Sequence, residues 1–459
     1  MREARLLRCA ALACLAHVAT AMGIGREGQE TGDEGTWGFD FGPEVPGTYL
    51  PTPFGIEKLP AETQSFATEK EWLRFKAARH FAGVLRTGTK SVVIPAFNPG
   101  VTSLAKGSIA FHEIRRALQE KNRLIPGADV AYVAAFKNGP AQCDRFPSHE
   151  EHYERGQARR AGRLRVAATS FYTKYAILDE KLRVVALVGS DPSAEPILRG
   201  DGLRTNLMLE RLHDVRITDM GRGAEGLYLR TGWIVNKRRK VVFKIDWLHL
   251  SVSALGDVVG KILPLADEVL PGILEQNGKN LGVLWDGDDS KGLEIVTWLG
   301  DKCVTVQQWP FAGDNGRNAT CGTPLNSRIR NGGTPIDLEP FCPGFYMGVG
   351  HLNLDYGPRG DIGTKWGNTY VQYAVVFRKE QPHHTLAVRG PFCFPSVHQP
   401  ERCDWVQFLS EPLLVENSTV IFPYGVNDCE SAYARMPVEK VLDFVFMANR
   451  EARERHCLI

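Results

Sequence analysis

Polar and charged residues recur near the ends of strand-like runs in this sequence. Asp214 stands two residues before a cation, Arg216, and a positioned carboxylate of this kind can act as acid or base on a glycosidic bond. One carboxylate is sufficient if the nucleophile is phosphate or an acceptor hydroxyl. The other side chains fit the same chemistry. The residues that could donate hydrogen bonds to a phosphate are Arg115, Arg216, Lys279 and His351. The residues suited to contact with a sugar are Asn98, Tyr424 and Asp428.

Each of these residues also has a plain structural explanation. Asp214 and Arg216 alternate along a strand, so their side chains are expected to face the same way and could form a structural ion pair. Lys279 and Asn280 could be a turn before a strand, and His351 could be a core histidine. Asp428 could cap a turn. Their order along the chain is what favours a common site.

The elements that must position these residues are mostly strands. From Ser91 onward, short runs rich in Val, Ile, Tyr and Trp follow one another between turn residues, without regular alternation of strand and helix. This pattern predicts an all-β propeller or a large sandwich. The predicted runs are 91–97, 128–136, 183–189, 227–235, 241–252, 281–285, 293–299, 303–309, 345–354, 369–377 and 405–425.

Three helices are predicted beside the strands. Residues 69–85 and 254–274 have helical spacing of apolar residues, and the second is amphipathic rather than membrane-spanning. A last helix begins at Pro437 and buries Val438, Val441, Leu442 and Val445.

The N-terminus has the features of a secretory leader. Three arginines precede the apolar stretch 9–21, which ends in small residues, so residues 1–23 are expected to be a signal peptide. Whether it is cleaved or kept as an anchor stays open, and so does membrane association. Residues 24–85 form an expected stem with a helix, and residues 86–459 the propeller. Eight cysteines beyond the leader and sequons at Asn318 and Asn417 agree with disulfides and glycosylation in the secretory pathway, in the ER or Golgi lumen or outside the cell.

Other classes of function are disfavoured by what the sequence contains. The formal charge of +2 gives no reason to expect a nucleic-acid partner. Zinc-ligand spacing, a phosphate-cradling glycine loop and a GxSxG elbow are missing from the sequence, and we expect neither a metal nor a cofactor. Asp286, Asp288 and Asp289 are expected to lie at a hairpin tip rather than to bind a nucleotide sugar.

The ordered motifs resemble a known family, the five-bladed β-propellers of the β-mannoside phosphorylases and related mannosyltransferase-phosphorylases. The resemblance covers about seven tenths of the chain. It implies a five-bladed β-propeller with a few peripheral helices, and Asp214 as the catalytic acid/base, relaying a proton through a sugar hydroxyl. The motifs that carry it are Asn98-Pro99, Arg115, His213-Asp214-Val215-Arg216, Lys279-Asn280, Gly350-His351 and Tyr424-Gly425-Val426-Asn427-Asp428.

One motif departs from the family, because His213-Asp214-Val215-Arg216 lacks the Glu and the Pro of the family's Glu-Asp-Pro-Arg. The preferred hypothesis is an inverting glycosyltransferase of mannosyl type, with a glycan acceptor and a nucleotide sugar or sugar phosphate as donor. A phosphorylase or hydrolase of the same propeller type is an alternative. A hydrolase would need a second carboxylate, for which Glu210 and Glu430 are candidates. A non-catalytic glycan-binding propeller is the other alternative.

Overall fold

The computed structural model describes most of the chain from Ala96 onward, together with three short segments before it. The described residues are 57–58, 84–87, 90–93, 96–124, 126–138, 172–191, 212–220, 226–235, 241–264, 280–285, 292–309, 329–354, 369–394, 407–416, 418–426 and 430–458. They form an all-β structure with three helices, which confirms the predicted class.

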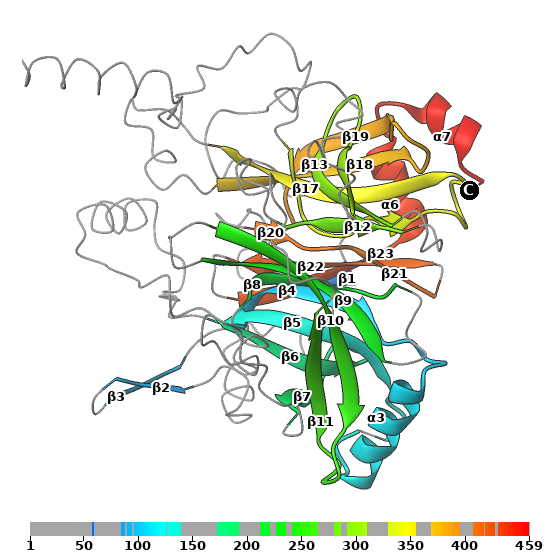
Figure 1. Cartoon of the computed structure of the whole chain (residues 1–459). Coiled ribbons are helices and arrows are strands. Elements are labelled where there is room, and N and C mark those ends of the chain that lie inside the picture. Colours follow the sequence, from blue (N-terminus) through cyan, green and yellow to red (C-terminus); the bar gives the residue numbers. More distant parts are fainter. Residues whose placement is uncertain are drawn as a thin grey trace, which may run out of the picture.

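Antiparallel neighbours along the chain build the first of two eight-stranded sheets. Two successive groups of four strands each fold as a meander, and a short parallel pairing of β7 with β11 joins them into one eight-stranded sheet (Figure 1). The first meander comprises β4 (Ala96–Ser103), β5 (Val130–Asn138), β6 (Tyr172–Asp179) and β7 (Val184–Ser190). The second comprises β8 (His213–Thr218), β9 (Leu227–Val235), β10 (Val241–Val252) and β11 (Val258–Pro264).

The following strands form a second eight-stranded sheet. Its main path is β12 (Gly282–Leu284), β13 (Leu293–Leu299), β15 (Ile329–Asn331), β17 (Phe345–Leu354), β18 (Thr369–Arg378) and β19 (Thr385–Phe392). Two strands lie off this path, β14 (Thr305–Trp309) on β13 and β16 (Ile336–Asp337) on β17. The five separate blades expected from the sequence are therefore not resolved as separate sheets, and their number stays a prediction.

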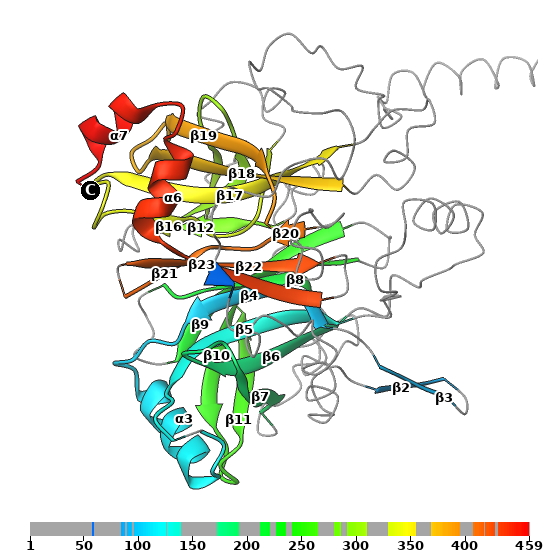
Figure 2. The ribbon, with the colours of Figure 1, turned by 180° about the vertical axis from the view of Figure 1, so that it is seen from behind.

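The last sheet brings the two ends of the described chain together. It contains β1 (Glu57–Lys58), β23 (Glu430–Pro437), β22 (Thr419–Val426), β20 (Gln407–Leu409) and, paired to β22, β21 (Leu413–Val415). A separate hairpin pairs β2 (Val84–Thr87) with β3 (Lys90–Val93). β4 packs against β8 and β22 through the middle of the molecule, so strands far apart in sequence share one centre (Figures 1 and 2).

Helices cover the outside of this arrangement. Helix α3 (Ile109–Glu120) begins after Ser108, whose hydroxyl accepts a hydrogen bond from the Phe111 N–H at 3.0 Å, and packs on β10. Helix α6 (Val438–Val445) starts after Pro437 and buries the four residues predicted for it, and α7 (Arg450–His456) follows. The Cys342–Cys457 disulfide holds the chain beyond α7 to the segment between β16 and β17. Cys303 and Cys393 each take part in a disulfide bond as well.

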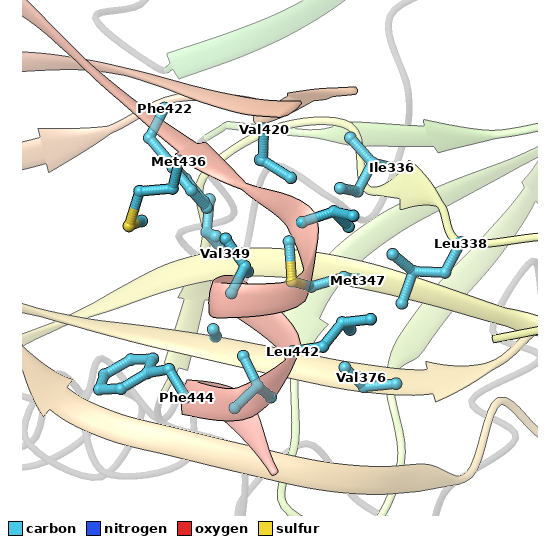
Figure 3. Close-up of a cluster of buried hydrophobic side chains, with 14 of the residues drawn as sticks. Ile336, Leu338, Met347, Val349, Val376, Val420, Phe422, Met436, Leu442 and Phe444 are labelled. Atoms are coloured by element: carbon cyan, nitrogen blue, oxygen red, sulfur yellow. The ribbon is translucent and has the colours of Figure 1, made fainter. Parts of the chain in front are cut away.

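The largest apolar cluster lies between α6 and the sheets beside it. Leu442 of α6 is fully buried in a cluster that also includes residues of β17, β18, β22 and β23, several of which are labelled in Figure 3. Truncating a buried leucine of this kind costs about 2–5 kcal/mol, so this cluster anchors the end of the chain.

One helix prediction is wrong. Residues 258–264 of the predicted helix 254–274 form strand β11, which pairs with β10 in a hairpin, and residues 265–274 lie outside the described part. Gly256 makes the sharp turn with a φ of 71°, and Val258 and Val259 are β-branched residues that suit a strand. Of the predicted helix 69–85, Val84 and Leu85 are described, and they lie in β2.

Candidate functional site

Three of the predicted site residues share an uncommon backbone conformation near the starts of strands. Asn98 in β4, Asp214 in β8 and Asn280 just before β12 have φ angles of 49°, 47° and 63°. All three are buried. This left-handed conformation costs about 1–2 kcal/mol for most residues and is best tolerated by Asn, Asp and Gly, and such strain clusters at functional sites.

Two of these conformations coincide with breaks in strand pairing. The pairing of β4 with β5 shifts register between Phe97 and Gly100, where Pro99 has no N–H to donate. β8 shifts against β9 between His213 and Arg216 in the same way. The alternation expected to place Asp214 and Arg216 on one face is therefore interrupted, and the two side chains have different ionic partners.

The Asp214 carboxylate is held by side chains from three other strands. Trp233 donates its indole N–H to Oδ2 at 2.8 Å, and Lys137 Nζ lies 3.0 Å from Oδ1. Asn98 Nδ2 donates to the same Oδ1 at 3.4 Å. A buried carboxylate with a cation and two donors around it is fixed in one orientation, as an acid/base group must be.

His213 packs against one member of this group, Trp233. Its ring lies on the Trp233 indole with the centroids 4.5 Å apart. The pKa of His213 is lowered to about 4, mainly by burial, which outweighs the opposing effect of Asp214 and is assisted by Lys137. The imidazole is consequently neutral at physiological pH and adds no charge beside the carboxylate.

Arg216 is buried in a separate contact set. Its Nε donates to the Gly332 carbonyl at 2.9 Å, and Nη1 donates to the Val215 carbonyl at 3.1 Å. Nε also lies 3.2 Å from Glu411 Oε2, and both side chains are almost fully buried. Nη2 has no hydrogen-bond partner among the described residues, so one donor of the guanidinium is left for a ligand.

An aromatic group lies beside this guanidinium. The Phe408 ring centroid is 5.3 Å from Arg216 Cζ, and His351 contacts the same ring at 4.9 Å. Tyr370 lies against His351 at 4.8 Å. His351 and Arg216, two of the predicted site residues, therefore lie on the same Phe408 ring.

Other buried polar atoms, in or beside β12, β15, β18 and β20, have no hydrogen-bond partner within the described part of the chain. Both amide atoms of Asn280, Asn331 Oδ1, Gln372 Oε1 and Ser410 Oγ are buried in this state. Buried polar groups are normally hydrogen-bonded, so a set of this kind is typical of a centre that holds water or a polar ligand.

Two predicted site residues lie elsewhere. Arg115 is on helix α3 and not at a strand end, and it forms an ion pair with Asp129 at 3.0 Å. The Tyr424 ring is stacked on Phe394 at 5.2 Å inside the large apolar cluster, so that face is not available to a sugar. The next residue, Gly425, does reach the site, because a Cβ there would lie 1.9 Å from Asn98 Oδ1.

Several predictions fall outside the described residues. These are Lys279 and Asp428 of the site, Glu210, the aspartates at 286–289, the leader and the sequon residues Asn318 and Asn417. The side chain of Glu430 is also not described. Among the described residues, no group of three or more His, Cys, Asp or Glu side chains could hold a metal ion. No helix in the described ranges is long and apolar enough to cross a membrane.

Sequence reasoning missed three residues of the site: Lys137, Trp233 and Glu411. Lys137 and Trp233 lie within or beside predicted strands, and nothing in the local pattern marks them. Glu411 did carry a signal, since it is the one charged residue in the run from Trp405 to Val415. A lone charge in an apolar run is usually buried with a partner.

No family model matches the chain, and no curated protein matches it. Solved structures with some likeness include a glycosyl hydrolase from Bacteroides ovatus, with 13% identity, a TM-score of 0.39 and coverage of 85% of this chain and 94% of that one. The β-1,2-mannobiose phosphorylase from Listeria innocua has 14% identity, a TM-score of 0.39 and coverage of 79% and 95%. A GDP-Man-dependent mannosyltransferase from Leishmania mexicana has 10% identity, a TM-score of 0.37 and coverage of 83% and 96%.

Proposed function

We propose that this chain is an inverting carbohydrate-active enzyme of the secretory pathway, a glycosyltransferase of mannosyl type that uses Asp214 as its acid/base. The observation that carries the proposal is the Asp214 carboxylate, buried, strained and held by Trp233, Lys137 and Asn98. A structural ion pair with Arg216 is the weaker explanation, because the salt bridge of Arg216 goes to Glu411.

A second contact set supports a donor that contains phosphate. Arg216 keeps one free donor atom, Nη2, in a buried setting, and His351 lies one ring away. Guanidinium groups with fixed geometry are well suited to phosphate oxygens. In this proposal Arg216, His351 and Lys279 receive the phosphate of the donor, and Asn98 and Asn280 receive sugar hydroxyls.

The described carboxylates favour transfer or phosphorolysis over hydrolysis. A two-carboxylate hydrolase needs a second acid opposite the first. The Glu411 carboxyl lies against Arg216 Nε and accepts the Ile217 backbone N–H, so its described contacts engage it within the protein, and we assign it no role in activating water. We therefore keep a phosphorylase as the second candidate, because its nucleophile would occupy the same Arg216 site.

Compartment and architecture complete the proposal. Disulfides such as Cys342–Cys457 persist in oxidising compartments, which supports entry into the secretory pathway, with residues 1–23 as its signal peptide and glycosylation at Asn318 and Asn417. The meanders that meet through β4, β8 and β22 support a five-bladed propeller whose centre holds the site.

The proposal is tested by a screen of nucleotide sugars and sugar phosphates with oligosaccharide acceptors. Asp214→Asn should remain folded and lose turnover by about 10²–10⁴-fold, which is the usual contribution of a positioned acid/base. Asp257→Asn is the matched control, since this exposed carboxylate pairs with Lys121 on the outer turn of β10 and β11. NMR of the first product should show inversion at the anomeric carbon. Equal rates in the wild type and Asp214→Asn would place the chemistry elsewhere, and glycan binding without turnover by any donor would favour a binding propeller.

A further inference from the structure

The Glu411 carboxyl is enclosed by backbone on two sides. A Cβ at Gly333 would lie 2.5 Å from Oε2, and one at Gly100 would lie 3.0 Å from Oε1 and 2.4 Å from the Val215 carbonyl. Both positions need glycine for this close approach. Glu411 is 2% exposed, so the enclosure separates the carboxyl from bulk water.

Its two oxygens have different surroundings. Oε1 accepts the Ile217 backbone N–H at 3.4 Å. Oε2 has no hydrogen-bond donor among the described residues, although it lies 3.2 Å from Arg216 Nε. That Nε directs its hydrogen to the Gly332 carbonyl instead. Because an ionised oxygen without a donor is costly to bury, Oε2 is the natural position for a proton.

The charged group that faces Glu411 from the described elements is Arg216 of β8. From β4 and from the segment after β15, the residues that face the Glu411 carboxyl are the uncharged glycines Gly100 and Gly333. Burial raises the pKa of Glu411 to about 7, while Arg216 and the backbone N–H groups of Ile217 and Val101 act in the opposite direction. The carboxyl therefore changes charge near neutral pH, directly beside the guanidinium.

We propose that Glu411 is a positioning residue that couples anion binding at Arg216 to the uptake of one proton from solvent. An ionised Glu411 neutralises Arg216, whereas a protonated Glu411 leaves the positive charge free for the anion. The proton is added at Oε2, and no other bond forms or breaks. The inference rests on the anion site of the proposed function and adds its regulation: a donor with phosphate binds best at mildly acidic pH, as in the later secretory pathway.

The test uses sulfate, whose charge is constant across the range, and the full chain in calorimetric titrations from pH 5.5 to 8.5. Wild-type affinity should fall by up to about tenfold per pH unit above pH 7, the limit for one linked proton. Titrations in two buffers with different ionisation enthalpies should show net proton uptake at pH 7.5. Glu411→Gln should lose most of this uptake and bind sulfate at least tenfold more tightly than the wild type at pH 8.5.

Two controls isolate the effect. Glu416→Gln removes an exposed glutamate of the next turn and should keep the wild-type pH dependence. Arg216→Met should abolish the binding heat, and heat that persists would place the anion elsewhere and overturn the inference. Any contribution from protonation of His351 is shared by the wild type and Glu411→Gln, so it cancels in the comparison.

The inference fails if wild-type protein takes up no proton on binding, if the two proteins share one pH profile, or if sulfate does not bind at any pH. The measurement of proton uptake needs no variant, so its absence overturns the inference even if Glu411→Gln does not fold. Absence of turnover with every sugar donor would remove the proposed function while leaving this linkage intact, so the two failures are distinguishable.

Discussion

Lys137 Nζ lies 3.0 Å from Asp214 Oδ1, and this ion pair joins β5 to β8 across the contact between the first two meanders. The side chains of Lys137 and Asp214 are only 13% and 8% exposed. Both charges are thus largely removed from water, and each contributes to the compensation of the other.

A double-mutant cycle should measure that dependence. Lys137→Met and Asp214→Asn should each lower the free energy of unfolding by about 2–4 kcal/mol, because each removes the opposite charge from beside a buried charged partner. The double variant should lose about 1–3 kcal/mol less than the sum of the two single losses. Urea unfolding provides the measurement. Strict additivity would mean that the contact contributes nothing to stability.

Gly425 should tolerate no side chain. A Cβ at this position would lie 1.9 Å from Asn98 Oδ1, so Gly425→Ala must displace the Asn98 amide from Asp214. We expect a loss of about 1–3 kcal/mol in stability, typical of overpacking, together with weaker sugar binding. Gly107→Ala is the matched control, because a Cβ there meets nothing within 4 Å, and its stability should change by less than about 0.5 kcal/mol. Equal melting temperatures for the two variants would contradict the close approach.

The sequence predicted the elements better than their partners. Runs such as 227–235, 241–252, 293–299 and 345–354 match β9, β10, β13 and β17, because alternating apolar and β-branched residues are a local signal. The sequence predicts a helix over 254–274 where the structure has a turn and strand β11, because a short apolar run fits the 3.6-residue period of a helix as well as the two-residue period of a strand. The ion pair of Arg216 with Glu411 spans 195 positions of sequence, and no local pattern specifies such a contact. The motif around Asp214 marks it as a candidate, but the contacts of Lys137 and Trp233 with it depend on how the two meanders pack, which no local pattern predicts.

The C-terminal disulfide should contribute substantially to stability. Cys342 and Cys457 are separated by 115 residues, and closing a loop of this size corresponds to about 4–5 kcal/mol in the chain-entropy model. The Cys342→Ser/Cys457→Ser variant should therefore unfold at a markedly lower denaturant concentration. Substitution is preferable to reduction, since Cys303 and Cys393 are also disulfide-bonded. An unchanged midpoint would show that α6 and its apolar cluster hold the C-terminus without the crosslink.

His213 and Glu411 should give stability opposite dependences on pH. The folded pKa of His213 is about 4 against an ordinary 6.5, so the unfolded chain binds more protons between these values and stability falls as the pH is lowered through them. The folded pKa of Glu411 is about 7 against an ordinary 4.5. Here the folded chain binds more protons, so this contribution is lost as the pH rises from 4.5 to 7.

Between pH 4.5 and 6.5 the two effects oppose each other, and single variants should separate them. His213→Phe keeps a ring on Trp233 and removes the titration, so its stability relative to the wild type should improve by roughly 2 kcal/mol on going from pH 6.5 to 4.5. Glu411→Gln should show the reverse change over the same interval. Burial also affects His383, whose pKa is raised through its hydrogen bond to Glu294, but this group is present in every variant and cancels in the differences. Urea unfolding at half-unit steps of pH provides the curves. Parallel curves for the wild type and both variants would show that neither group changes its pKa on folding. Glu411 would then not be the group that takes up the proton.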